Sequence, residues 1–206
     1  MPLPIAHSLG GYALSEIQGL SFFDKKWKTI LFFVVLANAP DFDFLPGFLV
    51  NDPSRFHHGF SHTFGASVVA GFLGAFGFRK KFPFWKVFWI IGGVYFSHVL
   101  LDYFTEDRRP PYGVMLLWPF TDTYYISHFS IFKKVMRSND TLTFFPSLFS
   151  PHNLAEAWRE FVLMGSVCVL TRRFSVWKKR RAQALGAVPL AGPTISGNSS
   201  DTNAAV

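Results

Sequence analysis

The stretch Ser97–Thr105, Ser-His-Val-Leu-Leu-Asp-Tyr-Phe-Thr, closes an almost unbroken apolar run that begins near Phe82. The run predicts a helix over Phe84–Tyr103, which at a rise of about 1.5 Å per residue can just cross a hydrocarbon core of about 30 Å. His98 and Asp102 are four residues apart, so they project from one face of that helix. Such a pair can hold a metal ion, but it is also common as a polar contact between helices. The rest of the chain decides between these interpretations.

The composition is poorer in charge than that of an average soluble domain. Half of the 206 residues are hydrophobic, 18 % are aromatic and 16 % are charged. The net charge of +7 comes from short basic clusters that flank apolar runs. This placement fits anionic lipid headgroups better than a nucleic-acid-binding face, so no nucleic-acid partner is expected. The single Cys168 excludes an internal disulfide.

The predicted fold is all-α, a membrane-embedded bundle of about five helices with a polar metal-site end. The other four helices are expected at Pro4–Leu20, Trp27–Ala39, the segment from His57 to Phe78, and Leu154–Leu170. A long irregular segment from about Glu106 to Pro151 follows the fourth helix, with Ser130–Arg137 as a candidate short helix. The Gly10-Gly11 pair predicts close packing of the first helix against a neighbour.

The domain organisation is predicted to be one helical domain over residues 1–183 and a disordered tail over residues 184–206, because the tail is rich in Gly, Ala, Ser, Asn and Pro. The second apolar run is only about a dozen residues long, against the roughly 20 expected of a membrane span. A soluble helical protein with an apolar surface is therefore the alternative architecture.

Basic clusters alternate along the chain with histidines and aspartates. The basic clusters are Lys25–Lys28, Arg79–Lys81 and Arg172–Arg181. The positive-inside rule places them, and the C-terminus, in the cytoplasm, and it puts the imidazoles and carboxylates in one extracytoplasmic layer. Scattered core histidines would occur at all depths instead. The sequence therefore predicts a multi-pass membrane protein with a polar site at its extracytoplasmic end.

Carboxylates and single histidines supply candidate ligands in addition to the opening pair. Asp41 and Asp43 follow Pro40, which ends the second helix, and two carboxylates this close suit a divalent cation. The same residues are also a common turn signature, so a solvated helix stop is the alternative. His7 lies in the first turn of the first helix, and His128 is a weaker candidate in the irregular segment.

Two further motifs contain histidine. His57, His58 and His62 place three imidazoles within six residues, which a polar helix cap alone does not explain. We expect His58 and His62 to share a helical face, with His57 reaching round from the preceding loop. His152 and Glu156 repeat the four-residue spacing, but a Glu near a helix N-terminus is also favoured by the helix dipole alone.

This residue set predicts hydrolysis assisted by one or more divalent ions. Such an ion lowers the pKa of water toward neutrality and stabilises charge on a phosphoryl or acyl oxygen. Ligands beyond one tetrahedral set permit a second ion, or leave Asp41 or Asp43 as a general base. The sequence has no nucleophile elbow, phosphate-binding loop or dinucleotide fingerprint that would favour another enzyme class.

The ordered motifs resemble those of the bacterial family of membrane-bound metal-dependent hydrolases. They are Ala6-His7, Pro40-Asp-Phe-Asp43, His57-His-Gly-Phe-Ser-His62-Thr, Ser97-His-x-x-x-Asp102-x-x-Thr105, and Gly113 followed by Leu117-Trp-Pro119. That family usually has His-Arg-Gly-x-Thr-His-Ser in the third motif, so His58 stands at the Arg position and its role is left open. The resemblance implies a hydrolase of the bacterial inner membrane, with a substrate that is unassigned.

A more distant resemblance is to zinc-dependent phospholipase C and the related single-strand nucleases, which are all-helical. It implies one to three divalent ions, Zn2+ or Mn2+, and a phosphoester substrate that includes the phosphoester of a lipid. The expected ligands are His7, Asp41, Asp43, His57, His62, His98 and Asp102, with His58, His152 and Glu156 as weaker candidates. Expected partners are membrane lipids and a small-molecule or lipid substrate. The alternatives are a membrane protein that binds metal or a partner without turnover, and a transporter.

Overall fold

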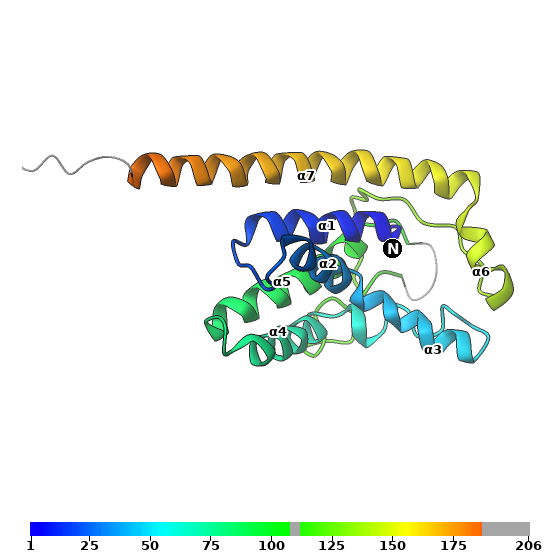
Figure 1. Ribbon diagram of the computed structural model, residues 1–206. Helices are drawn as coiled ribbons and strands as arrows, with labels where there is room; N and C mark the ends of the chain where they lie inside the picture. The colour runs from blue at the N-terminus through cyan, green and yellow to red at the C-terminus, as the bar shows by residue number, and fades with distance from the viewer. Residues whose placement is uncertain (108–111, 187–206) are drawn as a thin grey trace, which may run out of the picture.

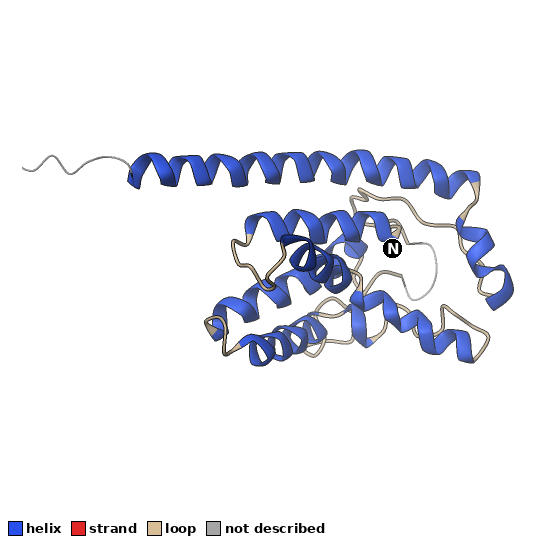
Figure 2. Cartoon of the chain, viewed as in Figure 1, coloured by secondary structure: helices blue, strands red, loops and turns tan. Residues whose placement is uncertain are grey.

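The computed structural model describes residues 1–107 and 112–186, and over these residues the all-α prediction is confirmed (Figures 1 and 2). The helices are α1 (Pro4–Ile17), α2 (Lys26–Ala37), α3 (Phe44–Leu49), α4 (Phe64–Phe78), α5 (Phe84–Tyr103), α6 (Thr141–Leu148) and α7 (Pro151–Gly186). Two 3-10 turns, η1 (Ala39–Asp43) and η2 (Phe60–His62), connect them. The described residues thus form more helices than the five predicted.

Helices α1, α2, α4 and α5 form the bundle, and α7 runs along α1 (Figure 1). Their shared core is aromatic and lies toward the α1–α2 and α4–α5 connections. Phe22 is at its centre, with ring centroids 5.5 Å from Phe33 and 4.9 Å from Phe78. The core reaches the polar end of the bundle only at Ala37, the last residue of α2.

Glycine brings helices into close contact, as predicted for the first helix. A Cβ added at Gly11 would lie 2.6 Å from the carbonyl oxygen of Phe33, so α1 and α2 touch through their backbones here. On α4, a Cβ at Gly71 would lie 2.9 Å from the carbonyl oxygen of Phe88. Small residues thus set the spacing of both helix pairs.

The prediction that a helix opens at the histidine motif is wrong. Helix α4 begins only at Phe64, after Thr63, whose hydroxyl accepts a backbone N–H of the first turn. The preceding residues form turns and η2, and His58 has a φ of 64°, which an α-helix excludes. His58 and His62 therefore do not share a helical face, and the segment from His57 wraps around the end of the bundle instead.

The segment after α5 also differs from the prediction. Ser130–Arg137 is not helical, and Phe132 within it forms an isolated bridge with Thr105. Helix α6 appears further on, where the Asp140 carboxylate caps it by accepting two backbone N–H groups. Of the predicted disordered tail, residues 187–206 lie outside the described residues, whereas residues 184–186 end α7.

Helix α7 has 36 residues, roughly twice the length predicted for the last helix. A buried glutamate on it secures α1, because the Glu160 carboxylate accepts the backbone N–H groups of Leu3 at 2.7 Å and Ala6 at 3.2 Å. No side chain of α1 itself caps this helix. The long helix thus supplies the missing cap at the end where His7 lies.

Among the described residues, α5 is the one helix long and apolar enough to cross a membrane alone, and 33 % of it is buried within the protein. Residues Lys26–Ala37 and Ala39–Leu49 pass the same test together, with a bend of 54° between them. Large apolar side chains remain exposed on α4 and α5, including Leu73 and Trp89, both 70 % exposed. Apolar surface of this kind marks a membrane or protein contact.

The basic clusters meet at one end of the bundle. Lys81 Nζ donates to the carbonyl oxygen of Phe22 at 3.0 Å, which joins the α4–α5 connection to the α1–α2 connection. Residues of the α1–α2 connection also line a cavity together with Lys178 and Lys179 of α7. The start of α1, the end of α2 and the end of α5 lie at the opposite end (Figure 1). The three basic clusters and the candidate ligands thus lie at opposite ends of the bundle, as predicted.

Candidate metal centre

The polar end gathers eight of the candidate ligands from four parts of the chain. They are His7 in α1, Asp41 and Asp43 in η1, His57, His58 and His62 before α4, and His98 and Asp102 in the last turns of α5. Several of them form groups of three whose ligand atoms lie within 4.8 Å of one another. The convergence expected from the sequence is therefore present.

Two imidazole nitrogens form the centre of this cluster. His62 Nε2 and His98 Nε2 lie 3.1 Å apart. Asp41 Oδ1 is 3.5 Å from each of these nitrogens, and Asp102 Oδ2 is 3.3 Å from each. Tetrahedral Zn2+ with ligands at about 2.1 Å separates those ligands by about 3.4 Å. Each triad of two imidazoles and one carboxylate thus has the dimensions of one face of a tetrahedral zinc site.

Hydrogen bonds on the far sides of both rings hold them in place. His98 Nδ1 donates to the carbonyl oxygen of Ala37, the last residue of α2, at 2.7 Å. His62 Nδ1 lies 3.1 Å from Asp43 Oδ2 and 2.9 Å from Ser61 Oγ. Metal-binding histidines usually use their second nitrogen in this way, which fixes the tautomer and aims the other nitrogen at the ion.

Asp43 and Asp41 differ in their contacts, although the sequence makes them look equivalent. Asp43 Oδ1 is 3.1 Å from His57 Nδ1, and Asp43 Oδ2 accepts the Ser61 hydroxyl at 2.8 Å. Neither carboxylate oxygen of Asp41 has a hydrogen-bond partner in the described part of the chain. Asp43 therefore lies behind the imidazoles, and Asp41 faces the cluster.

The cluster contains buried polar atoms without hydrogen-bond partners among the described residues. They are both ring nitrogens of His7, both carboxylate oxygens of Asp41 and of Asp102, and Nε2 of His57 and of His58. Each unsatisfied buried group costs about 1–3 kcal/mol. A cluster of so many unsatisfied atoms therefore needs an explanation. A divalent cation would satisfy them together, and imidazole with carboxylate is a donor set that Zn2+ binds. The residues fit a metal site.

Electrostatics favour the neutral, metal-binding form of two of the three loop histidines, His57 and His58. Burial lowers the pKa of His57 and His58 well below the ordinary value, and the charge of Arg137 lowers it further. Burial also acts to lower the pKa of His62, but the neighbouring carboxylates of Asp41 and Asp43 outweigh this effect and raise it. Because metal binds neutral imidazole, His57 and His58 are ready to ligate at neutral pH.

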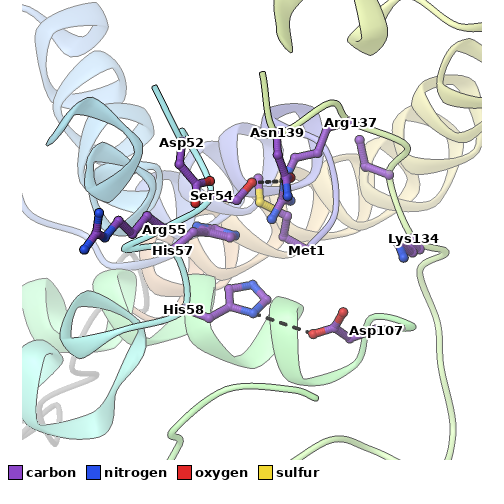
Figure 3. A pocket seen from close by; sticks show the side chains of 11 residues that line it. Met1, Asp52, Ser54, Arg55, His57, His58, Asp107, Lys134, Arg137 and Asn139 are labelled. Carbon is purple, nitrogen blue, oxygen red and sulfur yellow. Dashed lines mark hydrogen bonds and ion pairs between the residues drawn. The ribbon is translucent and has the colours of Figure 1, made fainter. Parts of the chain in front are cut away.

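A cavity of about 350 Å³ gives access to part of the cluster (Figure 3). His57 and His58 form part of its wall, and His58 Nδ1 lies 3.8 Å from Asp107 Oδ2. The charged residues around it are Asp52, Arg55, Asp107, Lys134 and Arg137. Three positive and two negative side chains thus line the route by which a small molecule would reach the imidazoles.

The structure does not bring the remaining candidates into the cluster. His152 Nε2 donates to the carbonyl oxygen of Lys134 at 3.0 Å, and Glu156 lies 3.6 Å from Arg159. His128 is exposed. The four-residue spacing of His152 and Glu156 on α7 therefore contributes nothing to the cluster.

Sequence reasoning missed two residues that this site uses. Asp107 belongs to a polar loop, Glu106-Asp107, which sequence alone assigns to solvent, yet its side chain lines the cavity. Ser61 appears only as a small polar residue within the histidine motif, yet it bonds both Asp43 and His62. The position of Ser61 directly before His62 was the one sequence signal that could have indicated its role.

The comparisons with known proteins agree with a membrane protein. A family model described as YdjM inner membrane protein matches residues 1–182, which include every candidate ligand. No curated protein and no solved structure matches the chain. The comparisons therefore give no support to the likeness to phospholipase C or the nucleases. Because the match covers nearly all of the described helices, the chain belongs to the YdjM inner membrane protein family.

Proposed function

We propose that this protein is a membrane-bound metal-dependent hydrolase that cleaves a phosphoester. The observation that carries the proposal is the set of buried carboxylate and imidazole atoms without partners, part of which borders a cavity. Structural metal sites are usually closed by protein ligands, whereas catalytic sites keep a position open to substrate. Arg55, Lys134 and Arg137 outnumber Asp52 and Asp107 around the cavity, and this excess of positive side chains favours an anionic substrate.

Each residue has a proposed role. His62, His98, Asp41 and Asp102 would hold one divalent ion, Zn2+ or Mn2+, and His7, His57 and His58 would complete this site or hold a second ion. Bound there, the ion supplies Lewis acidity toward water and a phosphoryl oxygen. One oxygen of Asp41 would bind the ion, and the other would accept the proton of the attacking water. Asp43 keeps His57 and His62 oriented.

Metal analysis of the full chain purified in mild detergent tests this proposal. Wild-type protein is expected to carry stoichiometric zinc or manganese, and His98→Ala and Asp102→Ala are expected to lose it. The exposed His128→Ala is the matched control and should retain it. Hydrolysis of a panel of phosphomonoesters and phosphodiesters should stop with a chelator and return with the ion. Protein without bound metal would refute the proposal, and metal without turnover would favour a non-catalytic metal-binding protein.

A further inference from the structure

Helices α3 and α6 together form an apolar cap beside the cavity. Their sequences, Phe-Leu-Pro-Gly-Phe-Leu and Thr-Leu-Thr-Phe-Phe-Pro-Ser-Leu, contain no charged residue. Aromatic rings join them, because Phe48 lies 5.2 Å from Phe144 and stacks on Phe145 at 5.5 Å. Two helices far apart in the chain thus make one surface.

The outer face of the cap consists of large exposed side chains. Leu49 and Leu142 are each 86 % exposed, and Phe149, next to α6, is 73 % exposed. Nothing in residues 1–107 or 112–186 covers them. Exposed apolar groups gathered in one place mark a binding surface, and single scattered ones do not.

The cap is continuous with the cavity through one aromatic ring. Phe44 stacks on His57 with ring centroids 4.1 Å apart and packs against Phe144 at 5.5 Å. The guanidinium of Arg137 lies 5.1 Å from the same ring, and its Nε donates to Ser54 Oγ at 3.3 Å. Figure 3 shows Arg137 beside Ser54 on the cavity wall. An apolar surface therefore leads to a cationic group and then to the candidate ligands.

An occupant of both features needs apolar chains joined to an anionic head. A membrane lipid with a phosphorylated headgroup has this chemistry, whereas the uncharged cap offers no charge that a protein partner could complement. Interfacial helices bury an apolar face about 5–10 Å into a bilayer and keep cations at the headgroups. The chain also belongs to a family of inner membrane proteins.

We propose that α3 and α6 dock in the membrane interface and that the cavity receives the phosphate headgroup of a lipid, with Arg137 contacting the phosphate. The docking of the cap is independent of catalysis. The assignment of the lipid headgroup as the substrate rests on the proposed hydrolase function. Two experiments separate these statements.

The first experiment measures the environment of the cap. A polarity-sensitive fluorophore is attached to Leu142→Cys in a Cys168→Ala background, with the full chain reconstituted in phosphatidylethanolamine–phosphatidylglycerol vesicles. We expect blue-shifted emission that brominated lipids quench. The same label at Asp122→Cys, an exposed loop position, should report water. Water-like emission at position 142 would overturn the docking, whatever the activity of the protein.

The second experiment compares phosphatidic acid in mixed micelles with soluble glycerol phosphate. Leu49→Gln combined with Leu142→Gln is expected to raise the ratio of the two KM values about tenfold, because lost apolar contact weakens only lipid binding. Leu73→Gln, at a side chain 70 % exposed on α4, should leave the ratio unchanged. Arg137→Gln should raise KM for both substrates.

The outcomes distinguish the two proposals. An unchanged ratio in the cap variant, with activity present, would refute delivery of a lipid to the site. No hydrolysis of either substrate by metal-loaded protein would refute the hydrolase, while a buried label at position 142 would still establish the docking surface.

Discussion

At the residue scale, Asp41 and Asp43 have separable roles. Asp43 contacts two imidazoles and a hydroxyl, whereas both carboxylate oxygens of Asp41 face the cluster. We expect Asp43→Asn to weaken metal affinity by about 10–100-fold without changing stoichiometry, because loss of an outer carboxylate misorients ligands without removing one. Asp41→Asn should lower the stoichiometry or abolish binding. Titration of zinc against a competing chelator measures both.

The exposed Asp24→Asn serves as the matched control, since it removes the same charge on the α1–α2 connection, at the end of the bundle opposite the cluster. Equal affinities for wild type and Asp43→Asn would show that Asp43 does not position the histidines. Complete loss of metal in Asp43→Asn, with metal binding unaffected in Asp41→Asn, would show that Asp43 is the ligand and Asp41 the outer carboxylate.

The sequence predicted which residues belong to the cluster better than it predicted the role of each residue within it. His7, His98 and Asp102 come together because helix ends converge, and hydropathy and charge alternation predict which ends meet. The task of His58 depends on a left-handed φ of 64° in a turn without regular structure. No sequence period encodes such a torsion, so the expectation of a shared helical face with His62 failed.

At the element scale, Gly11 sets the distance between α1 and α2. We expect Gly11→Ala to destabilise the fold by about 1–3 kcal/mol, because the new methyl meets the backbone carbonyl of Phe33 rather than a movable side chain. Gly93→Ala on α5 is the control, with no described atom within 4 Å of the added Cβ. Thermal unfolding in detergent, followed by circular dichroism, should show a lower Tm for the first variant alone.

Glu160 is the second point at which one element stabilises another. Glu160→Ala removes the acceptor of the Leu3 N–H and one of the two acceptors of the Ala6 N–H, and we expect a loss of about 1–3 kcal/mol in unfolding free energy. Because His7 lies in that turn, metal affinity should fall as well. Glu156→Ala, which removes a contact with Arg159, should leave metal affinity unchanged. Equal metal affinity in both variants would show that the Glu160 carboxylate does not support the metal site.

Helix boundaries were predictable where one apolar run spans the whole element. The limits of α5 agree with the prediction, because Pro83 precedes it and the apolar run continues to its last turn. Helices α3 and α6 were missed because they are short, each contains a proline, and their stability comes from contacts between them, such as Phe48 with Phe144. Contacts between distant segments leave little local signal in a sequence.

At the scale of the whole molecule, the charge distribution gives the bundle a direction. Basic residues at one end suit the cytoplasmic face, and the cluster with its apolar cap lies at the other end. In a membrane, the separation orients the protein and keeps the polar cluster at a water-accessible interface.

Labelling in spheroplasts and in inverted vesicles tests this orientation. In a Cys168→Ala background, Asp122→Cys lies near the candidate site, since the neighbouring Tyr124 lines a cavity with Asp43, and Lys80→Cys lies at the basic end. We expect a membrane-impermeant maleimide to modify position 122 from outside spheroplasts, because excess Lys and Arg retains a loop in the cytoplasm. Position 80 should react only in inverted vesicles. The reverse pattern would place the candidate metal centre on the cytoplasmic side, and reaction of both positions from one side would show that the bundle does not span the membrane.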